Sequence, residues 1–94
     1  MITAIVLIQA EVDRIPKVAE ALAELDGVSE VYSVTGEIDL IAIVRVRRHE
    51  ELADVIADRM GKVEGVRHSA THIAFRTYSQ HDLEAAFALG FEDA

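Results

Sequence analysis

Four segments of the chain have the apolar pattern of β-strands. Residues 2–10 and residues 39–46 are almost continuously apolar and rich in Ile and Val, which indicates strands buried on both faces. Residues 28–35 alternate less regularly and lead into Gly36, which marks a turn. Residues 66–78 form the fourth predicted strand. The pattern therefore predicts four strands, two of them buried on both sides.

Three further segments have the spacing of amphipathic helices. The first begins near Asp13, a candidate N-cap, and ends at Gly27. The second covers about residues 49–60. The apolar stripes of these two helices are Ile15, Val18, Leu22 and Leu25 in the first and Leu52, Val55, Ile56 and Met60 in the second. A short third helix is predicted between Ser79, which begins a capping box, and Gly90.

The predicted order is β-α-β-β-α-β followed by a terminal helix, and its two halves echo each other. Each half joins a helix to a strand through Gly-Val, in "LDGVSEV" and in "VEGVRHS". This order predicts an α+β, ferredoxin-like fold. Right-handed crossovers place both helices on one face of a four-stranded antiparallel sheet with strand order 4-1-3-2. Residues 1–79 are expected to form this domain, and residues 80–94 a terminal helix and tail.

The two central strands carry apolar side chains on both faces, although the helices cover only one. The alternating sets are Ile2, Ala4, Val6 and Ile8 against Ile5 and Leu7, and Leu40 and Ala42 against Ile41 and Ile43. At about 25 cal/mol per Å², leaving the second set in water forgoes several kcal/mol, comparable with the stability of a small domain. We therefore expect an identical sheet to cover this face and form a dimeric α+β barrel.

Composition and charge exclude several classes of function. The 94 residues are 51% hydrophobic and 28% charged, as in one globular domain. The 9 basic and 17 acidic residues leave a net charge of -8, which opposes binding to nucleic acid or to an anionic membrane. We interpret Arg45, Arg47 and Arg48 as the solvated end of a strand. No direct contact with nucleic acid or a membrane is expected.

Cysteine content and the amino terminus bear on the compartment. The chain has no cysteine, which excludes disulfides and fits a reducing environment. The opening "MITAIVLIQA" lacks the basic head and cleavage site of a signal peptide. No segment approaches the roughly 18 apolar residues that cross a bilayer. A cytoplasmic location is expected.

The histidines and serines form no recognisable metal or catalytic site. His68 and His72 lie four residues apart on a predicted strand, about 13 Å, whereas a ligand lies about 2 Å from Zn²⁺. His49 and His81 each begin a predicted helix, where a polar residue is common. No serine has a nucleophile-elbow context, and no phosphate loop or dinucleotide fingerprint is present. We predict no metal, no cofactor and no enzyme activity.

The turn from Thr35 to Asp39, "TGEID", is the main candidate for a binding site. Gly36 allows a ligand to approach the backbone and frees amide groups to hold a carboxylate, and Asp39 can accept hydrogen bonds from an ammonium group. Together they suit a zwitterion such as an amino acid. The alternative is an ordinary hairpin turn with a capping aspartate, and the spacing alone favours this alternative.

Two longer segments resemble the effector domain of the Lrp/AsnC (feast/famine) regulators, called the RAM domain. They are "GVSEVYSVTGEIDLIAIVRV" and, after a helix, "VEGVRHSATHIAFRTYS". The resemblance rests on Gly-Val before the second strand, a Thr-Gly-x-x-Asp turn into an apolar strand, and Gly-Val before a Thr-rich fourth strand. It extends from Ile2 to about Ser79.

The resemblance implies a sheet-to-sheet homodimer that assembles into tetramers or octamers and binds small amino acids between dimers. The matching ligand positions are Gly36 and Asp39 in the turn and Ser69 and Thr71 in the fourth strand. The further candidates are Thr35 and Ser33. Full-length family members carry an N-terminal helix-turn-helix, whereas here the first strand begins at Ile2. The chain thus resembles a stand-alone RAM protein that modulates full-length Lrp/AsnC regulators.

Two other functions remain open for a chain of this topology. One is a small dimeric α+β-barrel enzyme of the cofactor-free monooxygenase type, for which His72 is the candidate residue. The other is an ACT-like amino-acid-binding domain. An ACT-like pairing joins sheets edge to edge and leaves the second apolar face unexplained.

Overall fold

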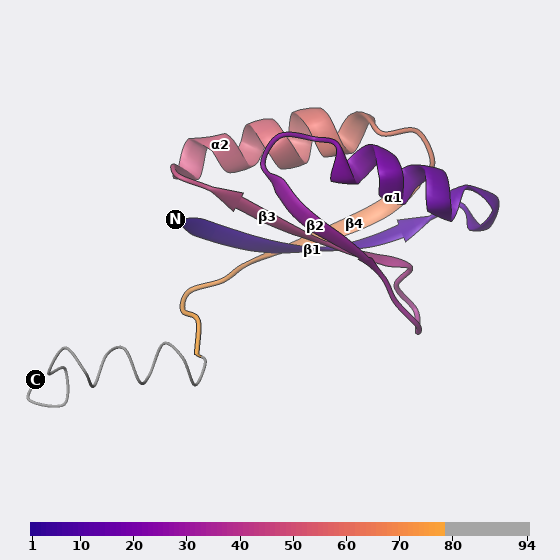
Figure 1. Cartoon of the computed structure of the whole chain (residues 1–94), viewed down its shortest axis with the longest axis horizontal. Coiled ribbons are helices and arrows are strands. Elements are labelled where there is room, and N and C mark those ends of the chain that lie inside the picture. Colours follow the sequence, from indigo (N-terminus) through magenta and orange to yellow (C-terminus); the bar gives the residue numbers. More distant parts are fainter. Residues whose placement is uncertain (79–94) are drawn as a thin grey trace, which may run out of the picture.

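The computed structural model describes residues 1–78, which form a four-stranded antiparallel sheet with helices on one side (Figure 1). The strands are β1 (Ile2–Ala10), β2 (Val28–Ser33), β3 (Leu40–Val46) and β4 (Val66–Ile73). The helical segments are η1 (Val12–Arg14), α1 (Ile15–Ala23), α2 (His49–Ala53), η2 (Asp54–Arg59) and η3 (Met60–Lys62). The strand order is β2-β3-β1-β4, the predicted order read from the other edge. The ferredoxin-like prediction is therefore confirmed.

Strand β4 is shorter than predicted because its partner ends. The backbone N–H of Ala74 donates to the carbonyl of Thr3 at 2.9 Å, and β1 begins one residue before Thr3, at Ile2. In this register only Ile2 and Met1 remain opposite residues 75 and 76, and nothing lies opposite residues 77 and 78, so β4 ends at Ile73 instead of residue 78.

The connection between β2 and β3 is longer than predicted. The last pair of the two strands is Ser33 with Leu40. Beyond this pair, a single backbone bond joins the N–H of Val34 to the carbonyl of Asp39 at 3.1 Å. Thr35 and Asp39 therefore lie in the turn and not at the ends of the strands, as the prediction had them.

The helical layer differs from the prediction mainly at its ends. Asp13 is not an N-cap: it lies within the 3₁₀ turn η1, and neither η1 nor α1 has a side-chain cap. The second helix begins at His49, as predicted, but continues through a π segment and a 3₁₀ turn to Lys62. The predicted third helix, from Ser79, lies outside the described residues.

The core lies between the sheet and the helices. It consists of the inward set of β1 and β3 together with side chains of α1, α2, η2 and η3. Its members are Ala4, Val6, Ile8, Ala10, Val18, Leu22, Leu40, Ala42, Val44, Val46, Leu52, Val55 and Met60. Gly27 lets the chain after α1 pass close to η2, because a Cβ there would lie 2.6 Å from Cγ2 of Val55. The inward set is the one that the alternation predicted.

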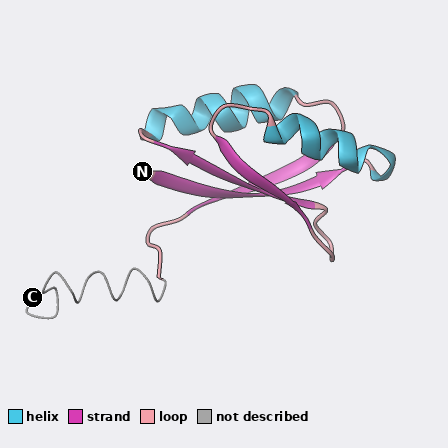
Figure 2. Cartoon of the chain, in the orientation of Figure 1, coloured by secondary structure: helices cyan, strands magenta, loops and turns pink. Residues whose placement is uncertain are grey.

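The other side of the sheet carries no helix in residues 1–78 (Figure 2). Leu7 pairs with Ile41 and Ile5 with Ile43, so these four apolar side chains share one surface at the centre of the sheet. They are only partly buried, whereas their sequence neighbours are buried. We call this surface, with the outward residues of β2 and β4 beside it, the open face. The predicted phase of the two central strands is confirmed.

Candidate functional site

The predicted ligand site lies at the end of the sheet where β1 ends and β3 begins. Thr35 and Gly36 are exposed in the turn between β2 and β3, and Ser33 is the exposed last residue of β2. Gly36 has a φ of 110° and no heavy atom within 4 Å of a Cβ built on it. The backbone at Gly36 therefore needs glycine for its conformation, and the space beside it is open to a ligand.

Asp39 ties this turn to the end of β1. Its backbone N–H donates to the carbonyl of Ile8 at 3.0 Å, and its Oδ2 accepts a hydrogen bond from the backbone N–H of Ala10 at 2.9 Å. The pairing of β1 with β3 ends at Ile8 and Leu40, so the N–H of Ala10 has no carbonyl of β3 opposite it. The carboxylate replaces that carbonyl. Asp39 thus has a structural role that the alternative interpretation, a capping aspartate, anticipated.

The two hydroxyl positions of β4 lie across β1 from this turn. Ser69 pairs with Ile8 and Thr71 with Val6, so both point to the helix side of the sheet, and both are exposed. Because Leu40 pairs with Ile8 on the other edge of β1, Ser69 lies two strand spacings from Leu40, about 10 Å. Within one chain, Ser69 and Thr71 therefore share the end of the sheet with Asp39 but do not converge with it on one small ligand.

Two cavities lie away from the turn. A crevice of about 10 Å³ between sheet and helices is bordered by Ser69 and by core side chains, including Met60 and Val66. It has room for a single water molecule at most. A wider cavity of about 380 Å³ lies at the opposite end of the sheet, where Arg59 donates from Nη1 to the carbonyl of Asp26 at 3.1 Å. The sequence contained no local signal for this cavity, because its walls come from both halves of the chain.

A polar cluster that the sequence analysis missed lies on the open face. Tyr32 donates its hydroxyl to Oε2 of Glu30 at 2.6 Å, and Nη1 of Arg45 donates to Oε1 of Glu30 at 3.1 Å. The Tyr32 hydrogen bond and then Arg45 lower the pKa of Glu30, while the bond to Glu30 raises the pKa of Tyr32. The feature of the sequence that could have revealed this cluster is the two-residue spacing of Glu30 and Tyr32, because side chains two residues apart lie on the same face of a strand.

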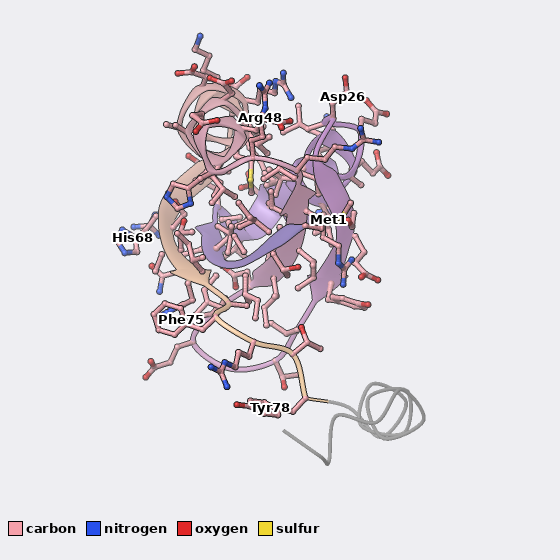
Figure 3. The ribbon with its side chains drawn as sticks, turned by 90° about the vertical axis from the view of Figure 1, so that its left-hand side faces the viewer. Met1, Asp26, Arg48, His68, Phe75 and Tyr78 are labelled. Atoms are coloured by element: carbon pink, nitrogen blue, oxygen red, sulfur yellow. The ribbon has the colours of Figure 1, made fainter. Side chains whose placement is uncertain are left out.

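The histidines of β4 lie on the open face as well. His68 pairs with Gln9 and His72 with Ile5, and both histidines are exposed. Figure 3 shows His68 pointing away from the sheet. His72, the candidate residue of the rival enzyme function, is thus exposed in the single chain. In residues 1–78, no group of three or more His, Asp or Glu side chains is placed to hold one metal ion. No helix of this part of the chain is long and apolar enough to cross a membrane.

The family follows from comparison with known proteins. The model of the Lrp/AsnC ligand-binding domain matches residues 3–83. The chain belongs to the Lrp/AsnC ligand-binding domain family. The domain is 35% identical over 72 residues to an uncharacterised HTH-type transcriptional regulator of Pyrococcus furiosus, covering 77% of this chain and 49% of the regulator. It spans about half the length of the curated relatives it matches.

Solved structures agree with this assignment. The Lrp/AsnC domain is 49% identical to a Thermus thermophilus protein of known crystal structure, with a TM-score of 0.80 over 85% of this chain and 100% of that one. Escherichia coli AsnC shares the fold at 20% identity, with a TM-score of 0.77 over 84% of this chain and 54% of AsnC. A Neisseria meningitidis transcriptional regulator, solved in complex with L-Met, shares it at 14% identity and a TM-score of 0.74, over 84% of this chain and 53% of the regulator. The recognised resemblance to Lrp/AsnC regulators is confirmed.

Proposed function

We propose that this chain is a non-enzymatic, amino-acid-binding module that works as an oligomer of Lrp/AsnC type. The observation that carries the proposal is the Thr35–Asp39 turn. It places an exposed positive-φ glycine beside a half-buried carboxylate at one end of the sheet. The amide groups near Gly36 suit a ligand carboxylate, and Asp39 suits a ligand ammonium. The L-Met bound to the Neisseria regulator belongs to the same class of ligand.

The ligand site is completed by a second copy of the chain. Asp39 already binds the N–H of Ala10 through Oδ2, so Oδ1 is the oxygen that meets the ammonium. Ser69 and Thr71 lie beyond β1 in the same chain, so the hydroxyls of a neighbouring copy complete the site at the turn. The proposed site therefore lies between dimers, and ligand binding and assembly are linked.

The dimer itself forms through the open face. Ile5, Leu7, Ile41 and Ile43 are partly exposed at its centre, and burying them stabilises the assembly by several kcal/mol at about 25 cal/mol per Å². Dimers then associate into tetramers or octamers, and the module co-assembles with full-length regulators of the family. The net charge of -8 disfavours direct contact with nucleic acid. We place the protein in the cytoplasm, where transcriptional regulators act.

Binding of the twenty amino acids to the full chain tests the proposal. A thermal-shift screen selects the ligand, since a ligand at 100 times its Kd adds about 2.7 kcal/mol to stability. Calorimetry then compares the wild-type chain with Asp39→Asn, which keeps an oxygen for Ala10 and removes the charge. Loss of a charge-assisted hydrogen bond of about 1.5–3 kcal/mol weakens binding by one to two orders of magnitude.

The matched control is Asp54→Asn, an exposed aspartate beside the cavity at the other end of the sheet. It should leave the affinity unchanged. If Asp39→Asn binds the selected amino acid as well as the wild-type chain does, Asp39 has only its structural role. If none of the twenty amino acids shifts the melting temperature, the chain is not an amino-acid-binding module.

A further inference from the structure

The chain after β4 leaves the body of the domain with two aromatic side chains exposed. Phe75 is 99% exposed and Tyr78 is 75% exposed. Figure 3 shows both on the side of the sheet away from the helices. The backbone bond from Ala74 to Thr3, 2.9 Å long, fixes the point at which the segment departs. We call residues 74–78 the arm.

We propose that the arm packs on a second copy of this chain, so that Phe75 and Tyr78 of each protomer contact the body of its partner across the open face. This inference rests on the dimer of the proposed function and adds a specific contact to it. Phe75 makes almost no contact with the other described residues, 1–78, because it is 99% exposed. Water is an unfavourable environment for a Phe side chain, so a partner surface is the expected one.

The side of the sheet from which the arm projects identifies the partner. The arm and the open face lie on the same side, opposite to α1 and α2 (Figure 1). At the other end of β1, the turn between β2 and β3 also bends to this side, where Nε2 of Gln9 donates to the carbonyl of Glu37 at 3.2 Å. The open face is thus flanked by projecting segments at both ends. A single partner seated on the open face meets both, and an identical chain presents an identical apolar surface.

The length of the arm fits this arrangement. Two sheets that pack face to face lie about 10 Å apart. Five extended residues span up to about 16 Å. The arm therefore reaches past the interface plane to the partner sheet, and Tyr78 reaches further than Phe75.

The arm also adds contact area to that of the sheets. Stable interfaces bury about 1,200–2,000 Å² of accessible surface in total. Each aromatic side chain buries about 150–250 Å². Two arms with two aromatic residues each therefore add about 600–1,000 Å² to the surface that the sheets bury.

Tryptophan fluorescence tests the position of the arm, because the chain contains no tryptophan. The full chain with Phe75→Trp carries a single indole on the arm. The control is Val12→Trp, at a residue of η1 that is 83% exposed and lies in the helical layer. In the dimer, the Phe75→Trp emission maximum should lie at shorter wavelength than that of Val12→Trp. It should move to longer wavelength on dilution to monomer, or when Ile41→Glu is added to separate the protomers.

Three results would overturn the inference, and they distinguish a failure of the arm contact from a failure of the dimer itself. An intact dimer with a water-exposed indole at position 75 refutes the arm and leaves the proposed function standing. An indole that stays shielded in the monomer shows that the arm folds on its own chain. A wild-type chain that is monomeric at micromolar concentration refutes the dimer and the arm together.

Sedimentation gives an independent measure. Phe75→Ala removes one anchor from each of two arms, so the dimer dissociation constant should rise about 100-fold, or tenfold for each arm. Val12→Ala, which removes an equally exposed apolar side chain from the helical layer, should leave the constant unchanged. Equal dissociation constants for Phe75→Ala and the wild-type chain would exclude the arm from the interface.

Discussion

Oδ2 of Asp39 accepts a hydrogen bond from the backbone N–H of Ala10 at 2.9 Å. The two residues are 29 positions apart in sequence, and their bond closes the end of β1 after its pairing with β3 has stopped. The bond is partly buried, so water replaces it poorly. The residue proposed to bind the ligand is therefore also one that holds the sheet end together, and its two roles need separate variants.

Asp39→Ala should destabilise the chain by about 1–3 kcal/mol, because the N–H of Ala10 loses its acceptor. Asp39→Asn keeps an acceptor oxygen and should cost less. Urea unfolding of both variants measures the difference. Equal loss of stability in the two would show that the charge, and not the acceptor, is what Ala10 requires.

Ile41→Glu should separate the dimer without unfolding the domain. The side chain lies on the open face beside Leu7 and is only partly buried in the single chain, so the monomer can solvate a carboxylate there. In the dimer the charge is buried without a partner, at a cost of about 3–5 kcal/mol, and the dissociation constant should rise at least about 100-fold.

Sedimentation velocity measures the dimer dissociation and circular dichroism checks that the fold is intact. Leu7→Glu should have the same effect as Ile41→Glu. Val12→Glu is the control, since Val12 is exposed in the helical layer. A dimer of unchanged affinity in Ile41→Glu would mean that the open face is not the interface.

Gly27→Ala should destabilise the chain more than Gly36→Ala. Both glycines have positive φ, 94° and 110°, so each substitution carries a backbone cost of roughly 1–2 kcal/mol. At Gly27 the new methyl group also lies 2.6 Å from Cγ2 of Val55, whereas at Gly36 it meets no atom within 4 Å. Overpacking adds about 1–3 kcal/mol at Gly27 alone. Thermal denaturation of the two variants compares them, and equal melting temperatures would contradict the prediction.

The Glu30 cluster should make the domain sensitive to acid. The hydrogen bonds from Tyr32 and Arg45 hold the pKa of Glu30 below its ordinary value in the folded chain. Glu30 therefore contributes stability that is fully present above its unfolded pKa and is lost as the pH falls through the lower, folded value. Tyr32→Phe removes the largest cause of the shift, so the Glu30 pKa should rise toward the ordinary value. Carboxyl-carbon NMR titration measures this directly, and an unchanged midpoint would show that Tyr32 does not influence Glu30.

The apolar pattern alone predicted three features: the two central strands with apolar side chains on both faces, the order of the elements, and the face of the sheet that the helices leave open. This was possible because side-chain alternation in a strand is a local property: Ile5 and Leu7 face away from Val6 in any pairing of β1. The strand ends were predicted less well. β4 stops at Ile73, close to where its partner β1 begins at Ile2, and the end of a partner strand is not encoded in the sequence of β4 itself.

The tertiary structure alone decided how the candidate residues relate to one another. The sequence selected Asp39 and Ser69, but only the register shows that β1 lies between them and that Ala10 occupies one carboxylate oxygen. The contact of Glu30 with Arg45 likewise depends on the pairing of β2 with β3 and its irregularity between Val28 and Glu30. Such contacts join segments far apart in the chain, and their geometry follows from strand register, which depends on the apolar patterns of both strands and on the turn between them and cannot be read from one strand alone.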